Sequence, residues 1–131
     1  LAIGSNIPRF VEQAFRGWAI DKSAFTDEDL ATYSAALAQP GALTAALNYY
    51  RGAARGGFRS LGGNGQVSMP TLLIWGEKDK ALGKETTYGT EQYVPDLRIH
   101  YIPNCSHWVQ QERPDEVNAQ LLAFLGHNEH Q

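Results

Sequence analysis

Apolar residues in the first part of the chain recur at steps of three and four, which is the spacing of one face of an α-helix. The spacing predicts one helix over Ile7–Trp18 and a second helix that ends at Gln39. Thr26 followed by Asp29 resembles a capping pair, so the second helix is expected to begin directly after Thr26. The first part of the chain is therefore predicted to be helical, with its helices antiparallel.

A third helix is predicted to follow directly, because Pro40 suits the first turn of a helix and the helical period continues beyond it. Gly52 and the glycines after it are expected to end this helix. From Gly56 to Ser68 the chain is rich in Gly and Ser, which is typical of a loop or linker. We therefore divide the chain into a helical segment, residues 1–57, and a second segment, residues 58–131.

The second segment changes from helical spacing to short apolar runs. Thr71–Trp75 is continuously apolar after its first residue, as in a strand that is buried on both faces of a parallel sheet. A second run, Leu97–Ile102, follows residues 84–93, which are long enough for a crossover helix. The second segment is therefore predicted to contain a β-α-β unit, which makes the fold class α/β.

A last helix is predicted to open at residues 113–116, where acidic residues favour a helix start. Its apolar side is formed by Val117, Leu121, Leu122 and Leu125. Two strands do not make a complete parallel sheet, because such strands need neighbours and helices on both faces. We infer that a longer chain or a second chain supplies more strands.

The composition is that of a globular protein and narrows the kind of partner. A net charge of −3, spread without a basic patch, argues against nucleic acid and a polybasic membrane surface, and favours a small neutral ligand. No apolar stretch approaches the roughly 20 residues of a spanning helix, and no secretion signal is visible. The expected compartment is the cytoplasm. Cys105 is the single cysteine, and the sequence leaves open whether the protein forms a homodimer.

Asp79 and His107 each follow a predicted strand, so both side chains are expected at the carboxyl edge of adjacent parallel strands. A carboxylate that accepts the Nδ1 proton of an imidazole fixes its tautomer and leaves Nε2 free to take a proton from water. The pair is thus a candidate general base. The structural alternative is that Asp79 caps a turn and His107 is a solvated loop residue. Glu77 is the main competitor for the role of the acid.

The remaining polar residues have simpler interpretations. Cys105 lies close to His107, where a small, half-buried residue is expected rather than a nucleophile. His100, His127 and His130 lack the spacing of a metal site. Neither a metal nor a cofactor is therefore expected.

Three stretches of the sequence resemble the α/β-hydrolase superfamily. Met69–Asp79 looks like its strand and acid loop, and the separation from Asp79 to His107 also fits. Asn104–Asn118 is similar to the histidine loop and final helix of soluble epoxide hydrolases and their dehalogenase relatives, and Leu47–Arg51 resembles the lid-helix segment of epoxide hydrolases. The resemblance implies the C-terminal portion of an α/β-hydrolase fold, in which a helical lid segment precedes a β-α-β-α unit of the core.

The resemblance also implies roles for individual residues in converting a small or medium apolar epoxide and water to a vicinal diol through a covalent ester. Asp79 would be the triad acid and His107 the base. Tyr50 takes the place of the lid tyrosine that donates to the epoxide oxygen, because ring opening develops an alkoxide that a phenol stabilises. Tyr49 and Trp108 would line the substrate pocket. Simple packing is the alternative role for Tyr50 and Trp108.

The nucleophile motif of the family, G-x-D-x-G or G-x-S-x-G, does not occur in this sequence. The oxyanion-binding His-Gly-x-Pro segment does not occur either. We therefore expect that these 131 residues alone do not turn over substrate, and that the same or a second chain supplies the missing N-terminal half. The alternatives are a haloalkane or haloacetate dehalogenase, an ester or carbon–carbon bond hydrolase, and a non-catalytic remnant or binding module.

Overall fold

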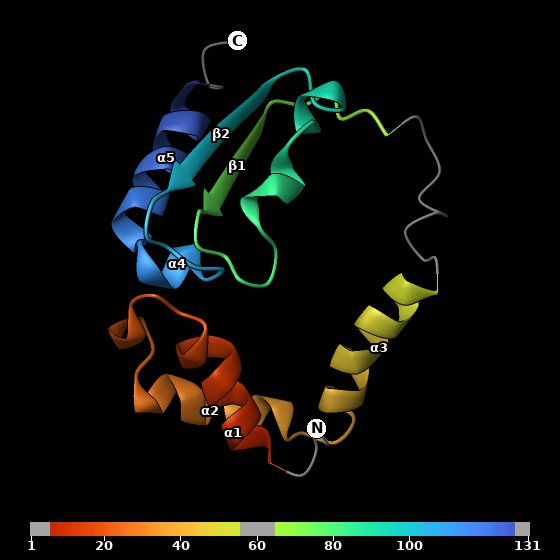
Figure 1. The fold of residues 1–131 in the computed structure, drawn as a ribbon, viewed down its shortest axis with the longest axis vertical. Helices are drawn as coiled ribbons and strands as arrows, with labels where there is room; N and C mark the ends of the chain where they lie inside the picture. The colour runs from red at the N-terminus through yellow and green to blue at the C-terminus, as the bar shows by residue number, and fades with distance from the viewer. Residues whose placement is uncertain (1–5, 56–64, 128–131) are drawn as a thin grey trace.

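The computed structural model describes residues 6–55 and 65–127, which form a helical part and a part that contains a sheet (Figure 1). The predicted boundary between residues 57 and 58 lies outside the described residues. In chain order, the helical part consists of α1 (Ile7–Glu12), the π-helical turn η2 (Gln13–Gly17), the 3₁₀ turn η3 (Lys22–Ala24), α2 (Asp27–Leu37) and α3 (Ala42–Ala54). The second part consists of β1 (Thr71–Gly76), the 3₁₀ turns η5 (Lys84–Thr87) and η6 (Thr90–Gln92), β2 (Leu97–Ile102), α4 (Val109–Glu112) and α5 (Pro114–His127).

The first predicted helix is confirmed, but it changes type partway. The Asn6 side chain caps α1 by accepting a hydrogen bond from the Arg9 amide at 3.0 Å, and η2 then continues the helical path. The Lys22 ammonium group caps the end of η2 by donating hydrogen bonds to carbonyls near the helix end, where intrahelical donors are lacking. Its three acceptors, at 2.6 to 2.9 Å, are the carbonyls of Arg16, Gly17 and Ala19.

The second predicted helix is confirmed together with its cap, although it ends at Leu37 rather than at Gln39. The Thr26 hydroxyl accepts from the Asp29 amide at 3.1 Å, and the Asp29 carboxylate accepts from the Thr26 amide at 2.9 Å. This reciprocal pair fixes the start of α2. The helical part then packs around a buried apolar cluster of Val11, Ala19, Phe25 and Leu30.

The third predicted helix exists, but its predicted start was wrong, and Gly52 does not break it. Pro40 lies before α3, because Gly41 adopts the left-handed conformation at φ 82° and caps the helix that starts at Ala42. At the other end α3 runs through Gly52 to Ala54. A single glycine costs a helix only about 1 kcal/mol relative to alanine, which the neighbouring turns outweigh. No residue of α3 is buried.

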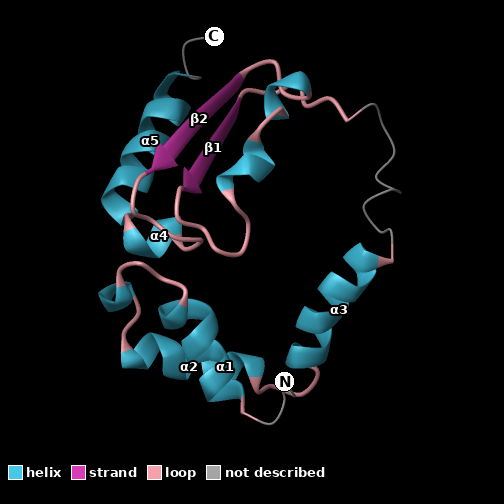
Figure 2. Cartoon of the chain, viewed as in Figure 1, coloured by secondary structure: helices cyan, strands magenta, loops and turns pink. Residues whose placement is uncertain are grey.

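The two predicted strands are confirmed and pair in parallel, as Figure 2 shows. Their register runs from Thr71 opposite Leu97 to Gly76 opposite Ile102. Both strands therefore end at the same edge, and the loops that follow them leave side by side. Among the described residues this sheet has two strands, consistent with the incomplete sheet inferred from the sequence.

The predicted crossover helix over residues 84–93 was wrong, because two 3₁₀ turns, η5 and η6, connect the strands instead. Gly89 separates the two turns in the left-handed conformation, at φ 83°. Threonine hydroxyls also bond backbone carbonyls three residues earlier, which competes with an α-helical hydrogen-bond ladder. The threonines that do so are Thr86, Thr87 and Thr90.

The last predicted helix is confirmed as α5, with Pro114 as its first residue. α5 runs alongside the sheet (Figure 1). Its Val117 is buried in a second apolar cluster with Ile102, Cys105 and Val109. Three leucines of its predicted apolar side remain exposed in this chain, by 41%, 73% and 58% for Leu121, Leu122 and Leu125.

Candidate active site

Two loops at the carboxyl edge of the sheet are tied to each other by backbone hydrogen bonds. The acid loop follows β1, and the histidine loop follows β2. The Glu77 amide donates to the Ile102 carbonyl at 3.1 Å, and the Lys78 amide donates to the Cys105 carbonyl at 2.9 Å. The parallel register thus extends beyond the strands and brings the two loops together.

Gly76 makes this close approach possible. A Cβ atom at this position would lie 2.0 Å from the Ser106 carbonyl oxygen and 2.6 Å from that of Cys105. Only a residue without a side chain fits there, because both obstacles are backbone atoms of the histidine loop. The last residue of β1 therefore determines how near the two loops can lie.

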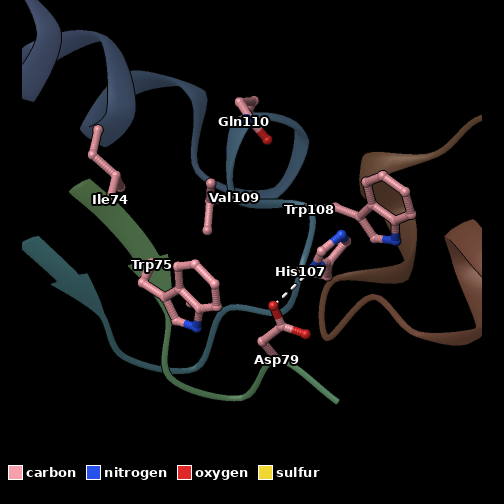
Figure 3. A pocket seen from close by; sticks show the side chains of 8 residues that line it. Ile74, Trp75, Asp79, His107, Trp108, Val109 and Gln110 are labelled. Carbon is pink, nitrogen blue, oxygen red and sulfur yellow. Dashed lines mark hydrogen bonds and ion pairs between the residues drawn. The ribbon is translucent and has the colours of Figure 1, made fainter. Parts of the chain in front are cut away.

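Asp79 is fully engaged by its own loop and by His107 (Figure 3). Its Oδ1 accepts from the amides of Ala81 and Leu82 at 2.8 and 3.0 Å, and its Oδ2 lies 2.8 Å from His107 Nδ1. Since a carboxylate accepts but does not donate, the hydrogen of this pair belongs to Nδ1. The predicted pairing of the two side chains is present.

The pair faces a pocket of about 240 Å³. The pocket is lined by Ile74, Trp75, Gly76, Asp79, His107, Trp108, Val109 and Gln110. The Asp79 side chain is 4% exposed and that of His107 is 35% exposed, so the imidazole is the more accessible of the two. With Nδ1 bonded to Asp79, Nε2 is the ring nitrogen available to a water or substrate.

Glu77, the competing acid, has a different partner. Its Oε1 lies 2.7 Å from Lys84 Nζ, and this hydrogen bond holds the pKa of Glu77 below its ordinary value. The same bond raises the pKa of Lys84. Of the two acidic residues in the loop, Asp79 is thus the one that faces His107.

Trp108 both lines the pocket and packs against the helical part. Its ring stacks on Phe15 with the centroids 4.5 Å apart, and its Nε1 donates to the Ala14 carbonyl at 3.0 Å. Figure 3 shows the indole beside His107, on the side of the helical segment. Trp108 therefore lines this pocket and packs against the helical part at the same time.

Tyr49 and Tyr50 lie away from the pair. Both are on α3, where their exposed fractions are 68% and 70%, and their rings contact each other at a centroid distance of 5.5 Å. Neither contributes to the lining of the pocket. The structure brings Asp79, His107 and Trp108 together, but it does not bring the two tyrosines to them.

Cys105 is wholly buried. Burial raises the pKa of its thiol to about 11, and the charge of the nearby Glu112 carboxylate adds to the rise. A thiol in this state is protonated at neutral pH and is a poor nucleophile. Cys105 therefore packs in the core, and it is wholly buried where the sequence predicted a half-buried residue.

Within residues 6–55 and 65–127, no group of three or more His, Cys, Asp or Glu side chains could hold a metal ion. His100 pairs with Glu116 at 2.7 Å, and His130 lies outside the described residues. In the same part of the chain, the helices are too short or too polar to cross a membrane.

Sequence reasoning missed Glu112, which is 5% exposed and bonded to the histidine loop. One signal was present: Glu112 lies three residues after Val109, on the side of α4 that carries this buried residue. An acidic residue at such a position needs hydrogen-bond partners, which the sequence alone does not name.

No protein-family model matches the sequence. Comparison with individual known proteins does find relatives, and they agree with one another. The chain is 37% identical over 101 residues to the AB hydrolase superfamily protein YfhM of Bacillus subtilis, covering 77% of this chain and 35% of that protein. It is 34% identical over 129 residues to epoxide hydrolase 2 of Caenorhabditis elegans, covering 95% of this chain and 36% of that protein. It thus spans about a third of the length of these curated relatives.

A solved structure agrees with these sequence matches. The crystal structure of epoxide hydrolase A from Mycobacterium thermoresistibile superposes with a TM-score of 0.77 at 25% identity, covering 94% of this chain and 47% of that one. The matched portion includes both the helical part and the sheet with its loops. The chain therefore belongs to the α/β-hydrolase superfamily and, within it, to the epoxide hydrolase type.

Proposed function

We propose that this chain supplies the acid, the base and a lid tyrosine of an enzyme that converts small apolar epoxides to vicinal diols. The observation that carries the proposal is the Asp79–His107 pair at the pocket, with its 2.8 Å bond through Nδ1. The similarity to epoxide hydrolase 2 of Caenorhabditis elegans and to epoxide hydrolase A of Mycobacterium thermoresistibile supports the choice of epoxides over other substrates.

The step assigned to the pair is hydrolysis of a covalent ester. His107 Nε2 takes a proton from water, and the resulting hydroxide adds to the ester carbonyl. The ester C–O bond then breaks, and the proton held by His107 passes to the departing alkoxide to give the diol. The proton on the added oxygen leaves as the carboxylate is regenerated, and it replaces the proton that the epoxide oxygen received in ring opening. Asp79 stabilises the imidazolium that forms in between and keeps the ring oriented.

Tyr50 is assigned to the earlier, ring-opening step, in which its hydroxyl donates to the epoxide oxygen as negative charge develops there. Its exposure on α3 and the resemblance of residues 47–51 to a lid helix support this role. Because Tyr50 does not line the pocket in this chain, the role requires α3 to lie over the site in the complete fold.

The nucleophile is assigned to a part of the fold that this sequence does not contain. The relatives are about three times as long as the matched region, which supports this assignment. We refer to this chain together with that part, on the same or a second polypeptide, as the assembled protein. These 131 residues by themselves are expected to form no diol.

The direct test is diol formation from a small apolar epoxide by the assembled protein, its Tyr50→Phe variant and its Tyr49→Phe variant. Tyr50→Phe should slow ring opening by about 10²-fold or more, because it removes the group that stabilises the alkoxide. Tyr49→Phe keeps the ring and serves as the matched control. Absence of diol with the unaltered protein, together with hydrolysis of simple esters, would assign the site to an ester hydrolase instead.

A further inference from the structure

Glu112 is a buried carboxylate that accepts hydrogen bonds from two distant parts of the chain. Its Oε2 accepts from the amides of Ile20 and Asp21, both at 2.9 Å. Its Oε1 accepts from the Ser106 amide at 3.0 Å and from the Ser106 hydroxyl. A carboxylate at 5% exposure needs such a set of donors, and here they come from the helical part and from the histidine loop.

On the side of the histidine loop, Glu112 holds both neighbours of His107. It binds Ser106 directly, and the Ser106 hydroxyl oxygen in turn accepts from the Trp108 amide at 3.2 Å. The backbone on each side of His107 is therefore tied to the same carboxylate. Since Asp79 holds the imidazole ring, Glu112 and Asp79 together fix the residue from its backbone and from its side chain.

On the side of the helical part, Glu112 holds the turn between η2 and η3. Its bonds to Ile20 and Asp21 join residues more than 90 positions apart. Trp108 reinforces the same junction through its stacking on Phe15. Arg113 adds a longer contact, with its guanidinium 3.9 Å from the Asp21 carboxylate.

We propose that Glu112 is a positioning residue, which sets the location of His107 relative to the helical lid. Displacing the lid turn pulls on the carboxylate that holds the histidine loop, so the two move as one unit. This inference rests on the proposed function for its catalytic consequence: the distance from Nε2 to an ester formed beneath the lid depends on Glu112. The hydrogen bonds themselves do not depend on that function.

The test is Glu112→Gln in the assembled protein, read first by hydrogen exchange without substrate. A glutamine offers an acceptor at one end and an N–H group at the other, so one of its two sets of amide partners loses its acceptor. The amides of Ile20, Asp21 and Ser106 should all exchange roughly tenfold faster or more, because one set loses its acceptor and the other set exchanges a charged acceptor for a weaker, neutral one. The proton on His107 Nδ1 should also exchange faster.

Val117→Ala is the matched control, since it loses apolar packing in the same core without touching the Glu112 hydrogen bonds. It should lower the free energy of unfolding of the whole protein. The amides around Glu112 should then exchange faster only as far as global unfolding becomes more frequent, without extra local opening. In turnover, Glu112→Gln should lower kcat by about 10²-fold with little change in KM, as expected for a misplaced base. Val117→Ala should leave kcat unchanged.

Ser106→Ala provides a second variant that keeps Glu112. It removes the hydroxyl that accepts from Trp108, so the Trp108 amide should lose protection while Ile20 and Asp21 keep theirs. The proposal is overturned if Glu112→Gln leaves the exchange at Ser106 and at Ile20 as slow as in the unaltered protein. Coupled loss of protection in a protein that forms no diol would support the Glu112 bridge and contradict the proposed function, so the two failures are distinguishable.

Discussion

Two acidic side chains in one loop, only two positions apart, have opposite surroundings. Asp79 is nearly buried and accepts hydrogen bonds from two amides and from His107. Glu77 is 30% exposed in its side chain and pairs with Lys84. Because a base needs a partner that orients it, only Asp79 is placed to act through the imidazole.

This difference predicts unequal effects of two neutralising changes in the assembled protein. Asp79→Asn should lower kcat by roughly 10⁴-fold, the size seen when the acid of a Ser-His-Asp triad is made an amide, because the imidazole then takes the wrong tautomer. Glu77→Gln removes an equal charge two residues away and should leave kcat nearly unchanged. Steady-state kinetics on one epoxide measure both, and equal losses would show that net charge rather than orientation matters.

The sequence predicted one pair of site residues, Asp79 and His107, but not the buried Glu112. The Asp79–His107 pair was predictable because each residue directly follows a strand in a parallel unit. Glu112 was not singled out, because its four donors come from residues as far away as Ile20. Contacts of that kind depend on how the parts pack and leave little local trace.

At the scale of elements, the site depends on how β1 ends. Gly76 lets the backbone of the histidine loop pass where a Cβ atom would otherwise stand, 2.0 Å from the Ser106 carbonyl oxygen. Gly52, in contrast, lies on α3 with no atom within 4 Å of where its Cβ would be. One glycine is needed for a close approach, and the other is free to be replaced.

Alanine at these two positions should therefore change stability in opposite directions. Gly76→Ala must push the acid and histidine loops apart and should destabilise the assembled protein strongly, by several kcal/mol, as overpacking against backbone does. Gly52→Ala should stabilise it by about 0.5–1 kcal/mol, through helix propensity. Urea unfolding monitored by tryptophan fluorescence gives both values, and a neutral Gly76→Ala would contradict the packing of the two loops.

Local signals predicted some elements well and others poorly. The strand patterns of Thr71–Trp75 and Leu97–Ile102 and the Thr26–Asp29 cap act over a few residues, and the structure contains all of them. The crossover was mispredicted because Gly89 and three threonine side chains favour 3₁₀ turns. The start of α3 was mispredicted because Gly41, not Pro40, decides where the helix begins.

At the scale of the whole molecule, one apolar side of α5 is left uncovered in this chain. Leu121, Leu122 and Leu125 of α5 are exposed beside a sheet that has two strands in the described part of the chain. The chain spans about a third of the length of its curated relatives. These observations agree with the proposal that the remaining strands and the nucleophile come from a part outside this sequence.

We propose that His107 activates the water that hydrolyses a covalent ester, and trapping that ester shows whether it does. The His107→Gln variant of the assembled protein is mixed with one equivalent of a small apolar epoxide, and its intact mass is followed. We predict a stable increase equal to the mass of one epoxide, because ring opening proceeds while ester hydrolysis loses its base. An unmodified mass with diol forming at the rate of the unaltered protein would contradict this role of His107.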